Sequence, residues 1–77
     1  MKKLKDAQPA KGKYFVALNG DFTMSDVYFH SDSGYAEIGD IDFYGLGNVP
    51  KERILDEQFL LRDGYMYFVE IADENKK

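Results

Sequence analysis

The sequence predicts a small, mainly β domain of the β-rich α+β class. About five or six antiparallel strands are expected to form a meander, as a curved sheet or an open barrel. Short runs of β-branched and aromatic residues recur along the chain, and such residues favour strands. Asn19-Gly20 and Asp63-Gly64 each separate two of these runs, and both dipeptides favour a two-residue hairpin turn. The length of 77 residues allows one domain with a thin core.

The first half of the chain is expected to be sheet throughout. The expected elements are, in order, a strand over 14–18, a hairpin turn at Asn19-Gly20, a return strand from Asp21 or Phe22 through 27–30, and a polar turn at 31–34. Residues 35–44 are then predicted to form one long strand. Gly39 lies inside that strand, where a glycine indicates a bulge or a bend.

The second half is predicted to hold one short helical turn and a final hairpin. The helical turn is placed near 49–55, because Asn48 is a good N-cap residue and Pro50 suits the first turn of a helix. Strands over 57–62 and 65–71 are expected to pair across the Asp63-Gly64 turn. In that register Phe59, Leu61, Met66 and Phe68 share one face of the hairpin, which is predicted to be core.

Three segments are predicted from composition. Residues 1–12 are polar and lysine-rich without periodicity, which predicts a flexible basic tail. Residues 13–73 form the domain, and residues 74–77 a frayed C-terminus. Neither a secretion signal nor an apolar run of the ~20 residues that a membrane helix needs is found. With no cysteine in the chain, we expect a cytoplasmic protein of bacterial or phage type.

Charge is strongly segregated along the chain. From Tyr14 to Pro50 there is no Lys or Arg, although this span holds six carboxylates and eight aromatic rings. Residues 1–13 carry five lysines against one aspartate, and residues 14–75 carry thirteen acids against three basic residues. The whole-chain charge of −4 therefore conceals a body with a net charge of −10. An acidic body of this kind faces a basic partner, a cation or only water.

Asp40 and Asp42 are the centre of the predicted binding surface. On a strand, residues two apart share a face and lie about 6.7 Å from each other. Tyrosines beside carboxylates suit an arginine-rich partner, through ion pairing and cation–π contact. The candidate partner-binding residues are Asp21, Asp26, Asp32, Glu37, Asp40, Asp42, Tyr35 and Tyr44.

These observations favour a non-enzymatic, acidic protein-binding module. Duplex DNA carries one negative charge per ~3.4 Å along each strand, and carboxylates on two neighbouring strands, about 4.8 Å apart, approach that density. In size and charge the chain resembles small acidic proteins, often borne by phages or mobile elements, that inhibit a nucleic-acid-handling enzyme by occupying its basic groove. The prediction is thus an inhibitor or DNA mimic that binds a basic protein, without a cofactor, a membrane or nucleic acid as direct partner.

Several alternatives stay open. The acidic face can be a solvated surface alone. Alternatively, the domain can be a structural or regulatory module that self-associates, for example as a homodimer, through edge strands such as 65–71. A divalent-cation site is a lesser alternative, because the acids and His30 lack a complete calcium-loop spacing. His30 with Asp32 and nearby serines offers the residue types of a catalytic triad. Because these residues lie within a few positions of one another, in or near one turn, we interpret the match to a triad as a coincidence of composition. No catalytic residue is predicted.

Overall fold

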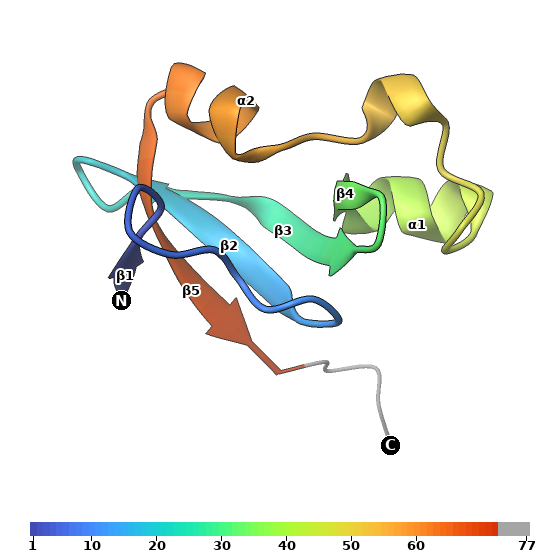
Figure 1. Ribbon diagram of the computed structural model, residues 1–77, viewed down its shortest axis with the longest axis horizontal. Helices are drawn as coiled ribbons and strands as arrows, with labels where there is room; N and C mark the ends of the chain where they lie inside the picture. Colours follow the sequence, from blue (N-terminus) through green and yellow to red (C-terminus); the bar gives the residue numbers. More distant parts are fainter. Residues whose placement is uncertain (73–77) are drawn as a thin grey trace.

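The computed structural model describes residues 1–72. Its centre is a five-stranded antiparallel sheet with the strand order β1-β5-β2-β3-β4, accompanied by two short α-helices and one 3-10 helix (Figure 1). The elements are β1 (Lys2–Lys3), β2 (Tyr14–Asn19), β3 (Met24–Ser31), β4 (Gly34–Glu37), α1 (Ile38–Tyr44), η1 (Lys51–Arg53), α2 (Glu57–Arg62) and β5 (Tyr65–Ile71). The predicted fold class, a small and mainly β domain with an open antiparallel sheet, is confirmed. No helix in this part of the chain is long and apolar enough to cross a membrane.

Strands β2, β3 and β4 follow one another as a meander, and β5 departs from that order. Instead of continuing beyond β4, β5 returns to the opposite edge of β2, where Val16 lies opposite Val69. On the other side of β2, the same Val16 lies opposite Val27 of β3. β2 is therefore the central strand, which explains why four of its six side chains are buried and the other two half-buried.

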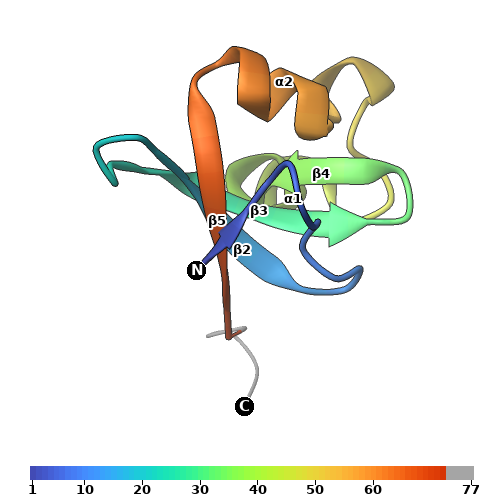
Figure 2. The ribbon, with the colours of Figure 1, turned by 60° about the vertical axis from the view of Figure 1, so that its left-hand side comes forward.

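The core lies on one face of this sheet and is rich in aromatic rings. It consists of Leu4, Phe15, Ala17, Tyr28, Tyr35, Leu60 and Phe68. The ring of Phe15 is at its centre, 4.9 Å from Tyr35 and 5.6 Å from Tyr28 between centroids. Helix α2 contributes Leu60, and the N-terminal segment contributes Leu4. Figure 2 shows the courses of helix α2 and the N-terminal segment relative to the strands. Edge-to-face aromatic contacts of this kind add to the free energy gained from burial.

The predicted flexible tail over residues 1–12 is wrong, because this segment belongs to the folded body. Lys2 and Lys3 pair with Phe68 and Tyr67 as an edge strand, and Leu4 has no exposed surface. Pro9 is buried as well. One apolar residue among lysines gives no periodic signal, yet burying a leucine side chain contributes about 1.5–3 kcal/mol. Residues 74–77, predicted to be frayed, lie outside the described residues.

The long strand predicted over 35–44 is wrong in its second half. β4 ends at Glu37, and α1 begins at Ile38. Ile38 and Ile41 are three residues apart and both half-buried, as expected for a helix that turns one side toward the sheet. The helix ends at Gly45, whose φ of 94° is readily adopted only by glycine.

The predicted hairpin around Asp63-Gly64 is also wrong. Residues Glu57–Arg62 form helix α2, and the carboxylate of Asp56 caps it by accepting a hydrogen bond of 2.9 Å from the Phe59 N–H. Gly64 then ends the helix with a φ of 97°, which is the usual place of a glycine after a helix. The strand predicted over 65–71 is confirmed, and so is the short helical turn near 49–55, which is η1.

Asn19 and Gly20 do join two antiparallel strands, through a wider loop than predicted. β3 begins only at Met24, and the Asn19 side-chain oxygen accepts hydrogen bonds from the N–H groups of Asp21 and Thr23. Phe22 takes a φ of 65°, which is rare for a bulky residue. Its ring stacks on Tyr67 at 5.6 Å.

Candidate functional site

Helix α1 separates the two aspartates at the centre of the predicted binding surface. Residues two apart in an α-helix are about 200° apart around its axis, so Asp40 and Asp42 do not share a face. Asp40 is also neutralised, because its carboxylate accepts a hydrogen bond of 2.8 Å from Arg53 Nε. Asp42 is exposed. The prediction of a shared carboxylate face for this pair is wrong.

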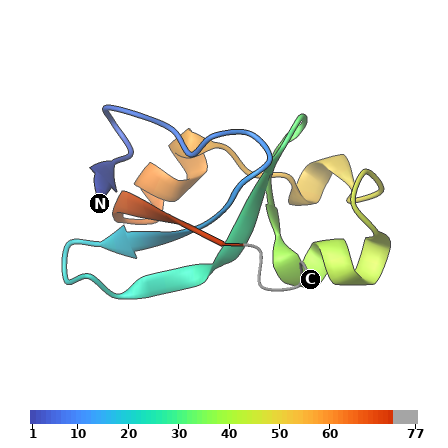
Figure 3. The ribbon, with the colours of Figure 1, turned by 90° about the horizontal axis from the view of Figure 1, so that it is seen from below.

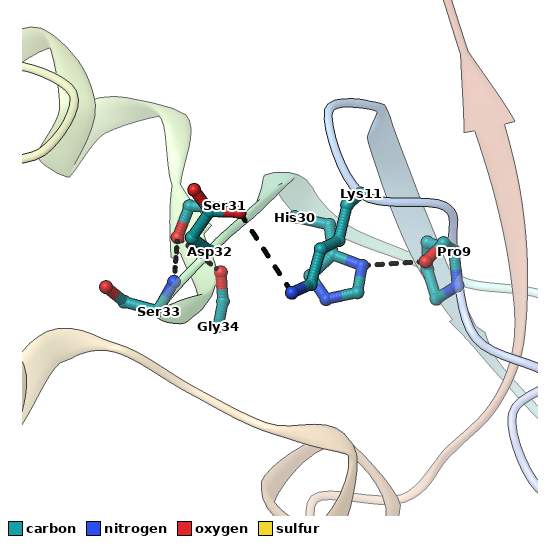
Figure 4. Close-up of polar contacts among 7 residues, drawn as sticks. All are labelled: Pro9, Lys11, His30, Ser31, Asp32, Ser33 and Gly34. Carbon is teal, nitrogen blue, oxygen red and sulfur yellow. Dashed lines mark hydrogen bonds and ion pairs between the residues drawn. The ribbon is translucent and has the colours of Figure 1, made fainter.

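Asp21 and Asp32 lie at opposite ends of β3, in its two flanking turns, and both are exposed. The side chain of Asp32 is fully exposed and lies 4.0 Å from Lys11 Nζ (Figure 4). This lysine comes from the N-terminal segment that sequence patterning assigned to a tail. The structure therefore brings neither aspartate together with the other predicted acids.

The two candidate tyrosines differ sharply in exposure. Tyr35 is only 2% exposed and belongs to the core, where its hydroxyl donates a hydrogen bond of 3.2 Å to Gln8 Oε1. Tyr44 ends α1 and is 37% exposed, with its ring edge-on to Phe43 at 4.8 Å. Only Tyr44 presents its ring to a partner.

The charges of Asp26, Glu37 and Asp63 all act on the hydroxyl of Tyr28. Glu37 of β4 lies opposite Tyr28 of β3 in register. The pKa of Tyr28 is raised to about 12, first by burial of the side chain and then by the nearby charges of Glu37, Tyr65, Asp26 and Asp63. We call these three carboxylates the acidic patch. Neither of the two ion pairs in residues 1–72 involves the patch.

Sequence reasoning found two members of the acidic patch and missed the third. Asp63 was assigned to a hairpin turn, whereas it is the C-cap residue of α2 and its charge acts on Tyr28 of β3. The signal was present in the sequence: Glu, Gln, Leu and Arg are good helix formers, and Asp56 stands where a helix N-cap residue belongs.

Raising the pH above 10 is expected to destabilise the fold. The pKa values of Tyr28 and Tyr35 are both raised to about 12, chiefly because the side chains are buried. Nearby carboxylates raise the pKa further, and for Tyr35 these are Glu57 and Asp56. The unfolded chain loses these protons near pH 10, so their contribution to stability is complete below pH 10 and declines between pH 10 and about 12. Urea midpoints followed by circular dichroism from pH 8 to 12 measure this decline.

Tyr28→Phe is the matched variant for this measurement, since it removes one late-titrating hydroxyl and keeps the ring. It should lose less stability than the parent chain between pH 10 and 12. An absorbance titration of the folded protein should show Tyr28 and Tyr35 ionising late. Equal slopes for the two proteins would contradict a role of Tyr28 in this pH dependence.

The residue types of a catalytic triad do not form a relay around His30. His30 Nδ1 lies 2.7 Å from the carbonyl oxygen of Pro9 and, as the donor of this pair, ties the N-terminal segment to β3 (Figure 4). The hydroxyl of Ser31 donates to the Gly34 carbonyl oxygen at 2.8 Å and accepts from the Ser33 N–H at 3.2 Å. These hydrogen bonds build the β3–β4 turn, so each polar group has a structural role.

Two open cavities border His30. The larger, of about 460 Å³, lies between the β3–β4 end and the segment that follows α1; its lining includes Phe29, Ala36, Leu46, Val49 and Ile54. The smaller, of about 290 Å³, is lined by Gln8, His30, Gly34, Tyr35, Asp56, Glu57 and Gln58. Within residues 1–72, no group of three or more His, Cys, Asp or Glu side chains is arranged to hold a metal ion.

Comparison of the chain with protein-family models, with curated proteins and with solved structures finds no match.

Proposed function

We propose that this chain is a non-enzymatic protein-binding module that inhibits a nucleic-acid-handling protein by occupying its basic surface. The acidic patch carries the proposal: the charges of Asp26 in β3, Glu37 in β4 and Asp63 at the end of α2 all act on Tyr28, and no lysine or arginine of residues 1–72 is ion-paired with them. A lysine- or arginine-rich surface would supply the counter-charges that residues 1–72 do not provide.

The placement of these acids supports mimicry of a nucleic acid. Asp26 lies two residues from Tyr28, which pairs with Glu37, so these two acids on neighbouring strands are diagonal neighbours roughly 7–8 Å apart, about twice the ~3.4 Å between charges along one DNA strand. A protein that binds phosphates would contact such carboxylates in the same manner and release its bound anions. Binding of this type weakens as the salt concentration rises.

The test is capture of proteins from a nuclease-treated bacterial lysate on the immobilised chain. We expect nucleic-acid-binding proteins to be retained in about 50 mM salt, and to be released by about 500 mM salt or by added duplex DNA. The variant Asp26→Lys/Glu37→Lys/Asp63→Lys should reduce this capture at least tenfold. Circular dichroism and thermal melting establish that the variant is folded.

A matched control separates the acidic patch from net charge. Asp21→Lys/Asp42→Lys/Glu52→Lys changes the charge by the same amount at three exposed sites elsewhere and should keep most of the captured protein. If both triple variants lose capture equally, the patch has no special role. If the parent chain retains no nucleic-acid-binding protein, the proposed function is wrong.

A further inference from the structure

The smaller of the two cavities beside His30, of about 290 Å³, lies where three segments of the chain meet. Gln8 of the N-terminal segment, Tyr35 of β4 and Glu57 of α2 all contribute to its lining. Figure 3 shows the N-terminal segment and α2 on the same side of β2 and β3. The cavity therefore opens on the core side of the sheet, between elements that are far apart in the sequence.

The side chain of His30 points to this smaller cavity. His30 lies opposite Tyr35 in register, and the centroids of the two rings are 4.8 Å apart in an edge-on contact. Residues opposite each other in a sheet project to the same side, and Tyr35 projects into the core. Phe29 and Ala36 alternate with this pair and line the larger cavity, so that cavity lies on the other side of the strands.

The ring nitrogen Nε2 of His30 is a hydrogen-bond acceptor that has no partner in residues 1–72 (Figure 4). Nδ1 lies 2.7 Å from the Pro9 carbonyl oxygen, which can only accept, so Nδ1 carries the proton and Nε2 of the neutral ring is bare. The residue as a whole is only 9% exposed. Within residues 1–72, no enclosed side-chain nitrogen or oxygen lacks a hydrogen-bond partner. Nε2 therefore opens onto free space, which the cavity provides.

The other polar side chains around the cavity can all accept hydrogen bonds, and two of them are charged. Burial of Tyr35, and then the charges of Glu57 and Asp56, raise the pKa of its hydroxyl to about 12, so both carboxylates act on this hydroxyl. The hydroxyl donates its proton to Gln8 Oε1 and keeps its lone pairs free. No lysine or arginine of residues 1–72 lines the cavity, and neither ion pair of this part of the chain involves its two acids.

We propose that this cavity binds a guanidinium group, carried either by a free small molecule or by an arginine side chain of another protein. A group that fits has to carry positive charge and to donate hydrogen bonds in several directions at once. The planar guanidinium does both, and it is more weakly hydrated than an ammonium group. Its N–H groups would bond to His30 Nε2 and to the Glu57 carboxylate, and Asp56 would add attraction. The site shares no residue with the acidic patch, and the inference does not depend on the proposed function.

NMR titration of the full chain tests the proposal. Methylguanidinium represents the free ligand, and N-acetyl-arginine amide represents an arginine within a protein. Both should shift the Nε2 resonance of His30 and the backbone amide of Glu57 to saturation, with roughly millimolar dissociation constants. Methylurea and N-acetyl-citrulline amide keep the planar shape without the charge, and should bind at least tenfold more weakly. The cationic probe that binds more tightly identifies the source of the group.

Asp56→Asn/Glu57→Gln removes the two charges of the cavity with little change of shape. Asparagine is also a good N-cap residue, so α2 should be retained, and circular dichroism establishes this. The variant should raise the dissociation constant of methylguanidinium at least tenfold. Asp21→Asn/Glu52→Gln is the matched control, because it removes the same charge at two exposed positions elsewhere. It should bind methylguanidinium like the parent chain.

Three results would overturn the proposal: equal binding of methylguanidinium and methylurea, equal losses in the two double variants, or a Nε2 resonance that stays unchanged up to about 100 mM probe. None of them bears on the capture of proteins by the acidic patch. A failure of this proposal is therefore distinguishable from a failure of the proposed function.

Discussion

Replacing Leu4 by alanine is expected to lower the free energy of unfolding by about 3 kcal/mol, although the residue lies in a lysine-rich segment. Leu4 has no exposed surface and packs in the core cluster with Phe15 and Leu60. The backbone holds it in place, because its N–H donates a hydrogen bond of 2.9 Å to the Met66 carbonyl oxygen. The shortened side chain therefore leaves a cavity that the surrounding rings cannot close. Urea unfolding measured by circular dichroism gives the loss.

In a domain of this size, a loss of about 3 kcal/mol corresponds to a fall in Tm of roughly 12–24 °C. Lys5→Ala, at the exposed neighbouring position, is the control and should change stability by no more than about 0.5 kcal/mol. Equal, small effects of both substitutions would show that the N-terminal segment does not contribute to the core.

Gly34→Ala is expected to destabilise the protein by about 3 kcal/mol, through two additive causes. Gly34 has a φ of 136°, and a Cβ atom there would lie 2.7 Å from Ile54 Cγ2 and 2.8 Å from the Leu55 carbonyl oxygen. That oxygen cannot retreat without loss, because it accepts a hydrogen bond of 2.9 Å from the Tyr35 N–H. The substitution therefore strains the backbone and separates β4 from the segment beside it.

Gly12→Ala distinguishes the two causes. Gly12 also has a positive φ, of 82°, but a Cβ atom there would meet nothing within 4 Å. It should show the backbone cost alone, about 1–2 kcal/mol. If the two alanine variants have the same Tm, the predicted clash with Ile54 and Leu55 is wrong.

The strands were predictable where one local rule decides the structure. The run of residues 14–18 has β-forming or apolar side chains at every position, which is typical of a strand with two apolar faces. Asn19 correctly marked a reversal of the chain, but not its length, because its side chain bonds two N–H groups and widens the loop.

The two helices were missed because short apolar runs do not distinguish helix from strand. Phe59, Leu60 and Leu61 are consecutive, and in α2 only Leu60 is fully buried whereas Phe59 is 43% exposed. Asp63-Gly64 ends a helix here, although the same dipeptide favours hairpins. In α1, the alternation of Ile41 with Asp40 and Asp42 imitates a strand.

The candidate surface was only partly predictable, for the same reason. Asp26 and Glu37 were chosen from a span without basic residues, yet Arg53, thirteen residues after Asp40, neutralises that aspartate. Asp63 joins the acidic patch through the tertiary placement of α2, from whose end its charge acts on Tyr28. Pairings between distant segments of this kind depend on tertiary structure, which local patterns do not report.

The position of β5 also has a kinetic consequence. Lys2 pairs with Phe68, and the central strand β2 acquires its second neighbour only when β5 is present. At about 5–20 residues per second, several seconds of synthesis separate these partners. During that interval Leu4 and Phe15 have no completed core to enter, so the nascent chain offers them to chaperones. Folding then awaits contacts between the two ends of the sequence, and such distant pairings make folding slow.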